Sequence, residues 1–360
     1  MFLRVFQHIW PSTTDSLRCS NFSVVWIRKQ GGMACHTLSG KVDKLLALPN
    51  LLRNREPFAI NHMRGMCEAG AGTKANLCRA LRAGRHKPMP RQPGVLPCFV
   101  LPDDSTACEA FRNQGTRPDL IYKPDVSTSA KGVEINAPHV CQRSSGVVQP
   151  LVSPLLVDGR KVDLRLYVLV RRKAHGAPII HLHRNGQAKV APVTYNKSIL
   201  HSALTNRAPT AQLAEKMRHD RLLIQQLARQ TSLPWEQIVW PRIRAAVAAV
   251  VTKVMDRAWK IAPCTQNRSA DPAQDCTRAF MLLGVDVILN EHGQPYVMEV
   301  NPDPSMLTLA SALDHSEAAR IHMFDSVYQG IAKLVGFDAG LRGRAGGSTH
   351  DWELLNNVLD

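Results

Sequence analysis

Acidic side chains interrupt an apolar stretch where a metal ion could bind. Residues 280–301, FMLLGVDVILNEHGQPYVMEVN, are expected to form two strands around the turn-forming sequence Asn-Glu-His-Gly-Gln. A loop of Glu291 to Gln294 would put Asp286 directly across from Glu299, with Asn301 on the same face. Two carboxylates that close on apolar strands need a shared proton, a basic side chain or a divalent cation between them.

Oxygen atoms of carboxylates and amides are the ligands that Mg²⁺ prefers, and such a site leaves positions for water and phosphate. Asp286, Glu299 and Asn301 are therefore the candidate metal ligands. The apolar run from Met281 to Leu289 favours burial on both faces. The alternative is a solvent-facing polar stripe on an edge hairpin, and a register change of one residue would put the two acids on opposite faces.

A second strand carries charges at alternate positions. In KVDLRLYVLV, residues 161–170, Lys161, Asp163 and Arg165 fall on one face and aliphatic side chains on the other. Cations that bind phosphate oxygens, with an acid that orients them, suit a polyphosphate site. An ordinary half-exposed antiparallel strand with internal ion pairs is the other interpretation.

A loop rich in small and polar residues follows Lys123, in the sequence KPDVSTSAKGVEI. Its backbone N–H groups and hydroxyls, together with Lys123 and Lys131, could cover phosphates, and Gly132 would allow close approach. The loop does not match the Walker pattern GxxxxGK[ST], so a solvated turn remains an alternative.

Composition limits the partners and the compartment. The 360 residues carry a formal charge of +16, which favours anionic partners. Only 6% of the residues are aromatic, and no basic run is interleaved with aromatics, which argues against a single-strand nucleic-acid platform. No apolar run reaches the ~20 residues of a membrane span.

The nine cysteines are odd in number and lack a CxxC pair, which argues against structural zinc and against a disulfide framework. Scattered cysteines of this kind fit free thiols in a reducing cytosol.

Local patterns predict a mixture of strands and helices without regular βαβ alternation, which indicates an α/β (α+β) fold rich in antiparallel sheet. MFLRVFQHIW at the start reads as a buried strand or, alternatively, a weak targeting segment. The expected strands are Phe22–Ile27, Cys98–Leu101, Leu120–Lys123, Lys161–Val170, Ile179–Leu182, Phe280–Leu289 and Pro295–Asn301. The expected helices are Lys41–Leu48, Lys74–Leu81, Ala211–Arg229, Ile243–Ile261 and His315–Leu334, with an exposed loop over Ala262–Thr277 and a linker over Pro88–Pro97.

Several of these motifs, in this order, resemble the tubulin–tyrosine ligase family of the ATP-grasp class. The family's KFDLRxYVL reads here as KVDLRLYVL, and its FxLxGFDxxxDxxxxPWLxEVNxxPS reads as FMLLGVDVILNEHGQPYVMEVNPDPS. VVQPLVSPLLVDG, ALTN and INHMRG are similar to further family segments, and the resemblance spans about residues 60 to 310.

The resemblance implies a nucleotide held between two lobes of an ATP-grasp fold. We therefore expect an N-terminal domain over residues 1–70, a central lobe over 71–160, and a C-terminal lobe with the metal site over 161–338. The composition of LRGRAGGSTH predicts a flexible tail, which we place over 339–360. Family members use ATP and one or two Mg²⁺ ions, with Mn²⁺ as a substitute. They join tyrosine, glutamate or glycine to a protein, typically the acidic tail of tubulin, through an acyl-phosphate.

The resemblance also implies partners, a location and a role for each candidate residue. The partners would be a free amino acid and either tubulin or another acidic protein, and no specific nucleic acid would be bound. The protein would be located in the cytoplasm, at microtubules, a cilium or a flagellum. The metal would be held by Asp286, Glu299 and Asn301. Phosphates would be contacted by Lys74, Lys123, Lys131, Gly132 and Lys161, the adenine hinge would be formed by Gln149 to Val152, and the ribose side would be lined by Thr205 and Asn206. The reacting groups would be acted on by Asp163, Arg165 and Lys189.

Departures from the family pattern leave two other functions open. Val133 and Glu134 follow Gly132 where the family has further glycine, and Glu134 would repel a triphosphate unless it points away. Lys189 replaces an arginine and so loses the bidentate fork, and Ala203 replaces a histidine. The alternatives are a catalytically weak member that binds tubulin or another acidic protein, and an ATP-grasp ligase with a non-tubulin substrate.

Overall fold

The structure is a computed structural model of the chain. It describes residues 14–19, 22–27, 58–61, 63, 65–82, 93–114, 118–125, 131–171, 178–205, 210–213, 216, 220–262, 279–302, 304, 323–324, 326–331, 334–335 and 351–355, with the backbone alone for the strands before residue 62. The predictions for residues 1–10, Lys41–Leu48, most of Ala262–Thr277 and the first half of Pro88–Pro97 lie outside the described residues.

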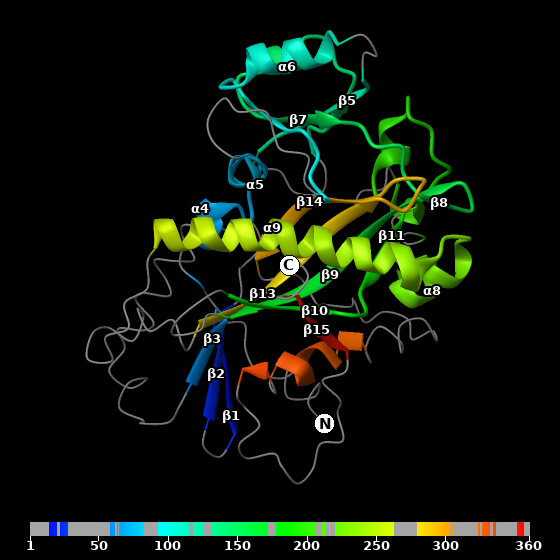
Figure 1. The fold of residues 1–360 in the computed structure, drawn as a ribbon. Helices are drawn as coiled ribbons and strands as arrows, with labels where there is room; N and C mark the ends of the chain where they lie inside the picture. Colours follow the sequence, from blue (N-terminus) through cyan, green and yellow to red (C-terminus); the bar gives the residue numbers. More distant parts are fainter. Residues whose placement is uncertain are drawn as a thin grey trace.

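A large sheet forms the centre of the molecule (Figure 1). Its main path runs β1-β2-β3-β13-β9-β10-β15, with β14 paired to β13, β8 and β11 to β9, and β12 to β11. All of these pairs are antiparallel except β2 with β3 and β3 with β13. The strands are β1 (Thr14–Cys19), β2 (Phe22–Ile27), β3 (Phe58–Asn61), β8 (Leu156–Val157), β9 (Arg160–Arg171), β10 (Ile179–His183), β11 (Gln187–Val190), β12 (Leu222–Leu223), β13 (Ala279–Leu289), β14 (Pro295–Pro302) and β15 (Trp352–Leu354).

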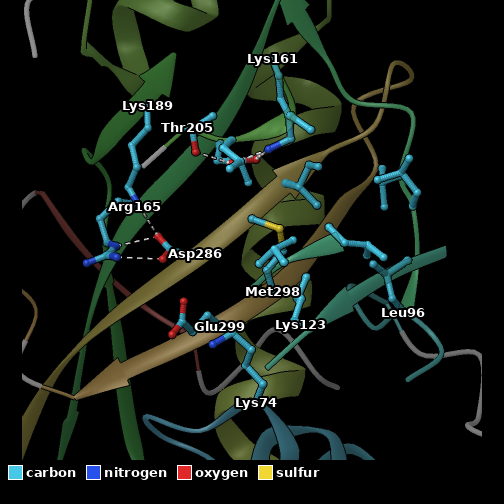
Figure 2. A pocket seen from close by; sticks show the side chains of 18 of the residues that line it. Lys74, Leu96, Lys123, Lys161, Arg165, Lys189, Thr205, Asp286, Met298 and Glu299 are labelled. Atoms are coloured by element: carbon cyan, nitrogen blue, oxygen red, sulfur yellow. Dashed lines mark hydrogen bonds and ion pairs between the residues drawn. The ribbon is translucent and has the colours of Figure 1, made fainter. Parts of the chain in front are cut away.

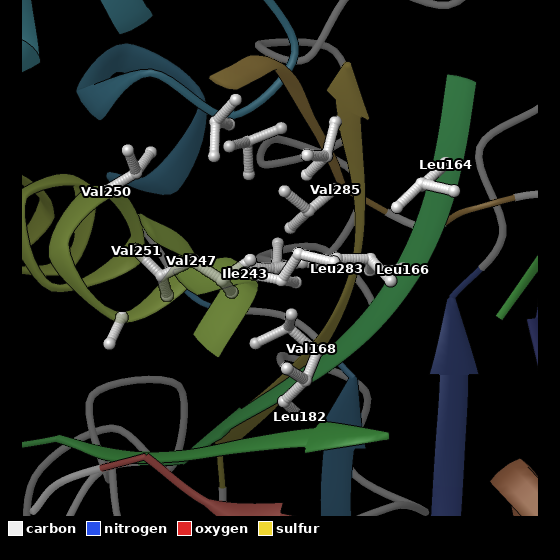
Figure 3. Close-up of a cluster of buried hydrophobic side chains, with 14 of the residues drawn as sticks. Leu164, Leu166, Val168, Leu182, Ile243, Val247, Val250, Val251, Leu283 and Val285 are labelled. Carbon is white, nitrogen blue, oxygen red and sulfur yellow. The ribbon is translucent and has the colours of Figure 1, made fainter. Parts of the chain in front are cut away.

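Helix α9 (Trp240–Ile261) covers one face of this sheet. Its buried side chains, among them Ile243, Val247 and Val251, pack against Leu166 of β9 and Leu283 of β13 (Figure 3). Alternation along the strands puts the aliphatic side chains of β9 on this face and its charged side chains on the other. The remaining helices are α4 (Met66–Ala69), α5 (Lys74–Leu81), α6 (Ser105–Arg112) and α8 (Ile224–Gln230), with short turns η1 (Val140–Gln142) and η2 (Leu200–Ala203) and the π-helical η3 (Trp235–Val239).

The opposite face of the sheet is divided between a polar part and a second apolar cluster. Tyr167 and Leu169 of β9, together with Phe280 and Leu282 of β13, pack there in a cluster with Met323, Phe324, Val327, Ile331 and Trp352. Because both faces are covered, β13 is buried along nearly its whole length, as its continuous apolar run predicts.

A smaller antiparallel sheet forms a separate layer above the first, in the order β4-β7-β5-β6 (Figure 1). Its strands are β4 (Phe99–Leu101), β7 (Gly146–Pro150), β5 (Leu120–Lys123) and β6 (Glu134–Ile135). Helices α5 and α6 flank it. Thr73 caps α5 by accepting from the Asn76 N–H, and the Asp125 carboxylate accepts from the Ala75 N–H at 2.7 Å.

The expectation of free thiols is wrong for the cysteines of this layer. Cys78 of α5 is bonded to Cys98, and Cys108 of α6 is bonded to Cys141, with Cα atoms 5.9 and 5.6 Å apart. Cys67 is disulfide-bonded as well. An odd count and scattered spacing do not reveal pairs that only the packing of α5 and α6 on the sheet brings together.

Two further expectations are wrong. The predicted helix Ala211–Arg229 is broken, because Leu222 and Leu223 pair with β11 and α8 begins only at Ile224. The tail is not flexible throughout, because Trp352–Leu354 adds a strand to β10 and buries the Trp352 side chain. In both places a pairing with a distant strand outweighs the local signal.

The predicted class is confirmed, since helices and antiparallel sheet are mixed. The strands expected at Phe22–Ile27 and Leu120–Lys123 and the helix at Lys74–Leu81 have the predicted ends. No described helix is both long and apolar enough to span a membrane. The division into four parts stays a prediction.

Candidate functional site

A cavity of about 340 Å³ lies between the smaller sheet and the polar face of the large sheet. One part of its lining is apolar, with Leu96, Ile121, Val152 and Met298 among the side chains. The rest is charged (Figure 2). Among the described lining residues the cations are Lys74, Lys123, Lys161, Arg165 and Lys189, and the carboxylates are Asp163, Asp286 and Glu299.

Asp286 of β13 is the most heavily bonded acid of the cavity. Its Oδ1 accepts from Arg165 Nε at 2.7 Å and from Lys189 Nζ at 2.8 Å. Its Oδ2 accepts from Arg165 Nη2 at 2.8 Å and, weakly, from Asn301 Nδ2 at 3.4 Å. Burial by itself raises the pKa of Asp286, but Arg165 and Lys189 together hold that pKa well below its usual range.

Asp163 of β9 organises the neighbouring part of the cavity. Lys161 Nζ donates to both of its carboxylate oxygens, and the Thr205 hydroxyl donates to Oδ2 (Figure 2). All three side chains are buried, with 5–7% of their surface exposed. A buried charge pair of this kind holds both groups in place, because separating them would leave an unpaired ion.

Glu299 of β14 lies on the cavity wall near Lys74 and Lys123 (Figure 2). Within the described part of the chain, no hydrogen bond or ion pair holds its carboxylate. Lys123 donates to Gln149 Oε1 at 2.9 Å. Burial, assisted by the neighbouring Lys74, lowers the pKa of Lys123 to about 8, although Glu299 opposes the shift.

The side chains fit a divalent cation only in part. Glu299 offers a carboxylate, and Asn301 offers its amide oxygen, because its Nδ2 is directed at Asp286. All four lone-pair positions of Asp286 are already in use, so Asp286 can bind a metal only by giving up a contact. The described residues contain no cluster of three or more His, Cys, Asp or Glu that could hold a metal. The described basic side chains on this pair, Arg165 and Lys189, neutralise Asp286.

The predicted pairing of Asp286 with Glu299 is confirmed. The predicted turn is nevertheless wrong by one residue. Leu289 rather than Asn290 faces Pro295, and Asn290 donates its N–H to the Gln294 carbonyl at 3.0 Å. The loop therefore has three residues, and Gly293 (φ 70°) closes it by donating its N–H to the Asn290 carbonyl at 2.9 Å.

A β-bulge restores the register between the turn and the acids. Val287 faces Val297 while Asp286 faces Glu299, so Met298 is the extra residue. Without the bulge, the observed turn would have put Met298 opposite Asp286. The bulge also turns the Met298 side chain toward the cavity.

Most of the predicted site residues meet in this cavity. Those that line it are Lys74, Lys123, Val152, Lys161, Asp163, Arg165, Lys189, Thr205, Asp286, Glu299 and Asn301. Gln149 is not in the lining and acts on Lys123 instead. Lys131 and Gly132 are exposed and do not line the described cavity, and Asn206 lies outside the described residues.

Glu134, which could have repelled a phosphate group, faces elsewhere. Its carboxylate pairs with Arg143 at 2.5 Å, and the Arg143 guanidinium lies 5.5 Å from the centre of the Tyr122 ring. Val133 rather than Glu134 lines the cavity.

Several lining residues were not among the predicted ones, including Leu96, Ile121, Tyr195, Ile288 and Met298. Two of them carried a usable signal, because Ile121 is two residues before Lys123 and Ile288 two residues after Asp286 on the same strand face. Met298 required knowledge of the bulge. We find no local signal for Leu96 or Tyr195.

Comparison with known proteins identifies the relatives of the chain. The sequence model of the tubulin-tyrosine ligase family matches residues 57–323. Human tubulin monoglutamylase TTLL4 is 26% identical over 291 residues, which are 74% of this chain and 23% of that protein. Human tubulin polyglutamylase TTLL5 is 26% identical over 231 residues, or 59% of this chain and 17% of that protein. Zebrafish (Danio rerio) tubulin polyglutamylase ttll6 is 23% identical over 299 residues, which are 74% of this chain and 35% of that protein. The chain thus corresponds to a minor part of each relative's length.

Proposed function

The chain belongs to the tubulin-tyrosine ligase family, and from that premise we propose that it is an ATP-dependent ligase that adds glutamate to the acidic tail of tubulin. The observation that carries the proposal is the division of one cavity into an apolar part and a part with five cations and three carboxylates. Such a cavity suits a nucleobase at one end and phosphate groups with a carboxylate at the other.

The amino acid and the acceptor are proposed from the relatives and from charge. The relatives named above are tubulin glutamylases, which favours glutamate over tyrosine or glycine. A net charge of +16 favours an acidic acceptor, and tubulin as acceptor favours association with the cytoskeleton, in the cytoplasm.

The proposed reaction forms an amide in two balanced steps. A carboxylate oxygen bonds to the γ-phosphorus of ATP as ADP leaves, and the incoming amine then bonds to the acyl carbon as phosphate leaves and a proton passes to solvent. The protein contributes position and charge. Lys74, Lys123 and Lys161 would bind phosphate oxygens, and Arg165 and Lys189 would bind the carboxylate of a substrate.

A metal ion belongs to the same proposal. Glu299, Asn301 and Asp286 would hold Mg²⁺, which would neutralise phosphate charge and polarise the phosphoryl group. Asp163 positions Lys161 through their ion pair and is itself held by Thr205. Lys131, Gly132 and Asn206 remain predicted nucleotide contacts, since they lie outside the described cavity lining.

The test of function is transfer of labelled amino acid. Purified protein is incubated with tubulin, Mg-ATP and labelled glutamate, glycine or tyrosine, and with a polyglutamate peptide as a second acceptor. We expect incorporation of glutamate into tubulin. If ATP binds but no amino acid is incorporated, the protein is a non-catalytic binding module, and transfer to the peptide alone would replace tubulin as the acceptor.

The test of the nucleotide site is calorimetric titration with a non-hydrolysable ATP analogue and Mg²⁺. Glu299→Ala is expected to weaken binding about tenfold or more, because among the described carboxylates of the wall it removes the one without a hydrogen bond or ion pair. Glu291→Ala is the matched control, since this acid lies in the turn of the same hairpin with its side chain 63% exposed. Equal affinity in both variants would contradict the site.

A further inference from the structure

Lys189 and a metal ion would compete for the same carboxylate, that of Asp286. The Lys189 ammonium donates to Oδ1 of Asp286, the carboxylate whose four acceptor positions are all occupied. No other ion pair or hydrogen bond of the Lys189 side chain occurs within the described residues. The side chain is only 13% exposed, so water would not fully solvate the ammonium if a metal ion bound Asp286 in its place.

Of the two cations on Asp286, Lys189 is the one that can leave. Arg165 donates two hydrogen bonds in a fork, whereas Lys189 donates one from a flexible stem. Arg165 also lies against Gly284, where an added Cβ would come within 3.0 Å of its Nη1 and 3.2 Å of its Cδ. The absence of a side chain at Gly284 thereby leaves room for the guanidinium beside Asp286.

Resting on the proposed function, we propose that Lys189 is an exchangeable counterion that couples metal binding to carboxylate binding. Without a divalent cation, Lys189 neutralises Asp286. When Asp286 ligates a cation, Lys189 loses its partner, and its buried ammonium requires a new anion. The carboxylate of the amino-acid or acceptor substrate supplies that anion.

Thermodynamic reciprocity makes the coupling measurable from both sides. If the metal frees Lys189 for a carboxylate, the carboxylate in turn strengthens metal binding by the same factor. A lysine that only bound substrate would weaken substrate binding when removed and leave metal affinity unchanged. A lysine that competes for Asp286 raises metal affinity when removed, and this sign distinguishes the two roles.

The experiment measures Mn²⁺ binding to the whole protein without ATP, by electron paramagnetic resonance of the free ion. Lys189→Met keeps the volume and removes the charge, and we expect it to bind Mn²⁺ about tenfold more tightly than the natural protein. We also expect 10 mM glutamate to strengthen Mn²⁺ binding to the natural protein but not to Lys189→Met, a concentration chosen as roughly saturating for a weak site.

Two controls separate this coupling from a general charge effect. Lys161→Met removes the same charge from the same face of the sheet, but Lys161 is bonded to Asp163 and not to Asp286, so Mn²⁺ affinity should change less than about threefold. Lys189→Arg keeps the charge and should not show the gain in affinity expected for Lys189→Met.

The outcomes distinguish failure of the coupling from failure of the site. If Mn²⁺ binds the natural protein and Lys189→Met with equal affinity, the coupling is overturned and the proposed metal site stands. If Mn²⁺ binds neither of them, both are overturned. If Lys161→Met gains as much affinity as Lys189→Met, net charge rather than competition for Asp286 is responsible, and the coupling is again overturned.

Discussion

At the residue scale, burial determines which cation of the cavity changes charge near neutral pH. Lys123 is enclosed between the two sheets and faces Lys74, and the resulting pKa of about 8 leaves its ammonium protonated at pH 7 but not at pH 9. Lys189 is also buried, which lowers its pKa, but its contact with Asp286 opposes that shift. The charge of each of these two lysines thus depends on the balance between its burial and the carboxylate near it.

Nucleotide affinity should therefore fall as the pH rises through about 8. The folded protein loses the Lys123 charge above that value, and a polyphosphate prefers the protonated form, so affinity decreases by up to tenfold per pH unit between about 8 and 10. Titration of a non-hydrolysable ATP analogue at pH 7, 8 and 9 measures the change. Lys123→Arg keeps its charge throughout and should give a flat profile; a similar decline in that variant would assign the pH dependence to another group.

At the element scale, the β13–β14 hairpin reaches its functional register through two irregularities. The loop is one residue shorter than expected, and the bulge at Met298 compensates before the chain reaches Glu299. A hairpin with either irregularity alone would put Glu299 out of line with Asp286, because a shift of one residue moves a side chain to the other face.

Strand β15 shows how the end of the described chain is held to the sheet. Trp352 packs into the cluster around Tyr167 and Phe324, and its ring lies edge-on to His183 with centroids 5.0 Å apart. Glu353 accepts from Trp240 Nε1 at 3.1 Å and pairs with Arg244 at 2.9 Å. These contacts order a segment that composition alone predicted to be flexible.

Removing the Trp352 side chain should lower stability without changing the nucleotide site. Trp352→Ala is expected to reduce the free energy of unfolding by about 3–5 kcal/mol, because it leaves a cavity in a buried cluster. Leu354→Ala is the control on the same strand, with the residue 46% exposed, and should have little effect. Urea unfolding measures both variants, and equal stabilities would contradict the packing of β15.

At the scale of the whole molecule, two disulfides cross-link the smaller layer. The Cys78–Cys98 and Cys108–Cys141 bonds tie α5 and α6 to the four-stranded sheet, across sequence separations of 20 and 33 residues. Helix α5 begins with Lys74, so its anchoring also positions a lysine of the cavity.

Reduction of these bonds should destabilise the protein. Loops of these lengths correspond to about 3 kcal/mol for each disulfide, so a phosphine reductant should lower the midpoint of urea unfolding. A variant with Cys78, Cys98, Cys108 and Cys141 changed to alanine should start from the lower midpoint and respond much less to the reductant. An unchanged midpoint in the natural protein would contradict the two bonds.

The same bonds test the proposed location. Disulfides persist in oxidising compartments and are rare in the cytosol. Mass spectrometry without reduction, on protein taken from its own cells, shows which state it has there. Free thiols would agree with a cytoplasmic ligase, and intact bonds would contradict that location.

The sequence by itself determined the faces of the strands and the family. Alternation put Lys161, Asp163 and Arg165 on one face, because successive side chains of any strand point in opposite directions. The motifs of β9 and of the hairpin were sufficient to indicate the family that residues 57–323 match.

Only the tertiary structure decided which groups are partners. Asp286 is bonded to Arg165, 121 residues away, and to Lys189, 97 residues away, and no local pattern predicted either pairing. The disulfides, the bulge and the docking of β15 were hidden in the same way. A local pattern is set by the geometry of neighbouring residues, whereas a pairing depends on where distant segments meet, and that is decided by the packing of the whole chain.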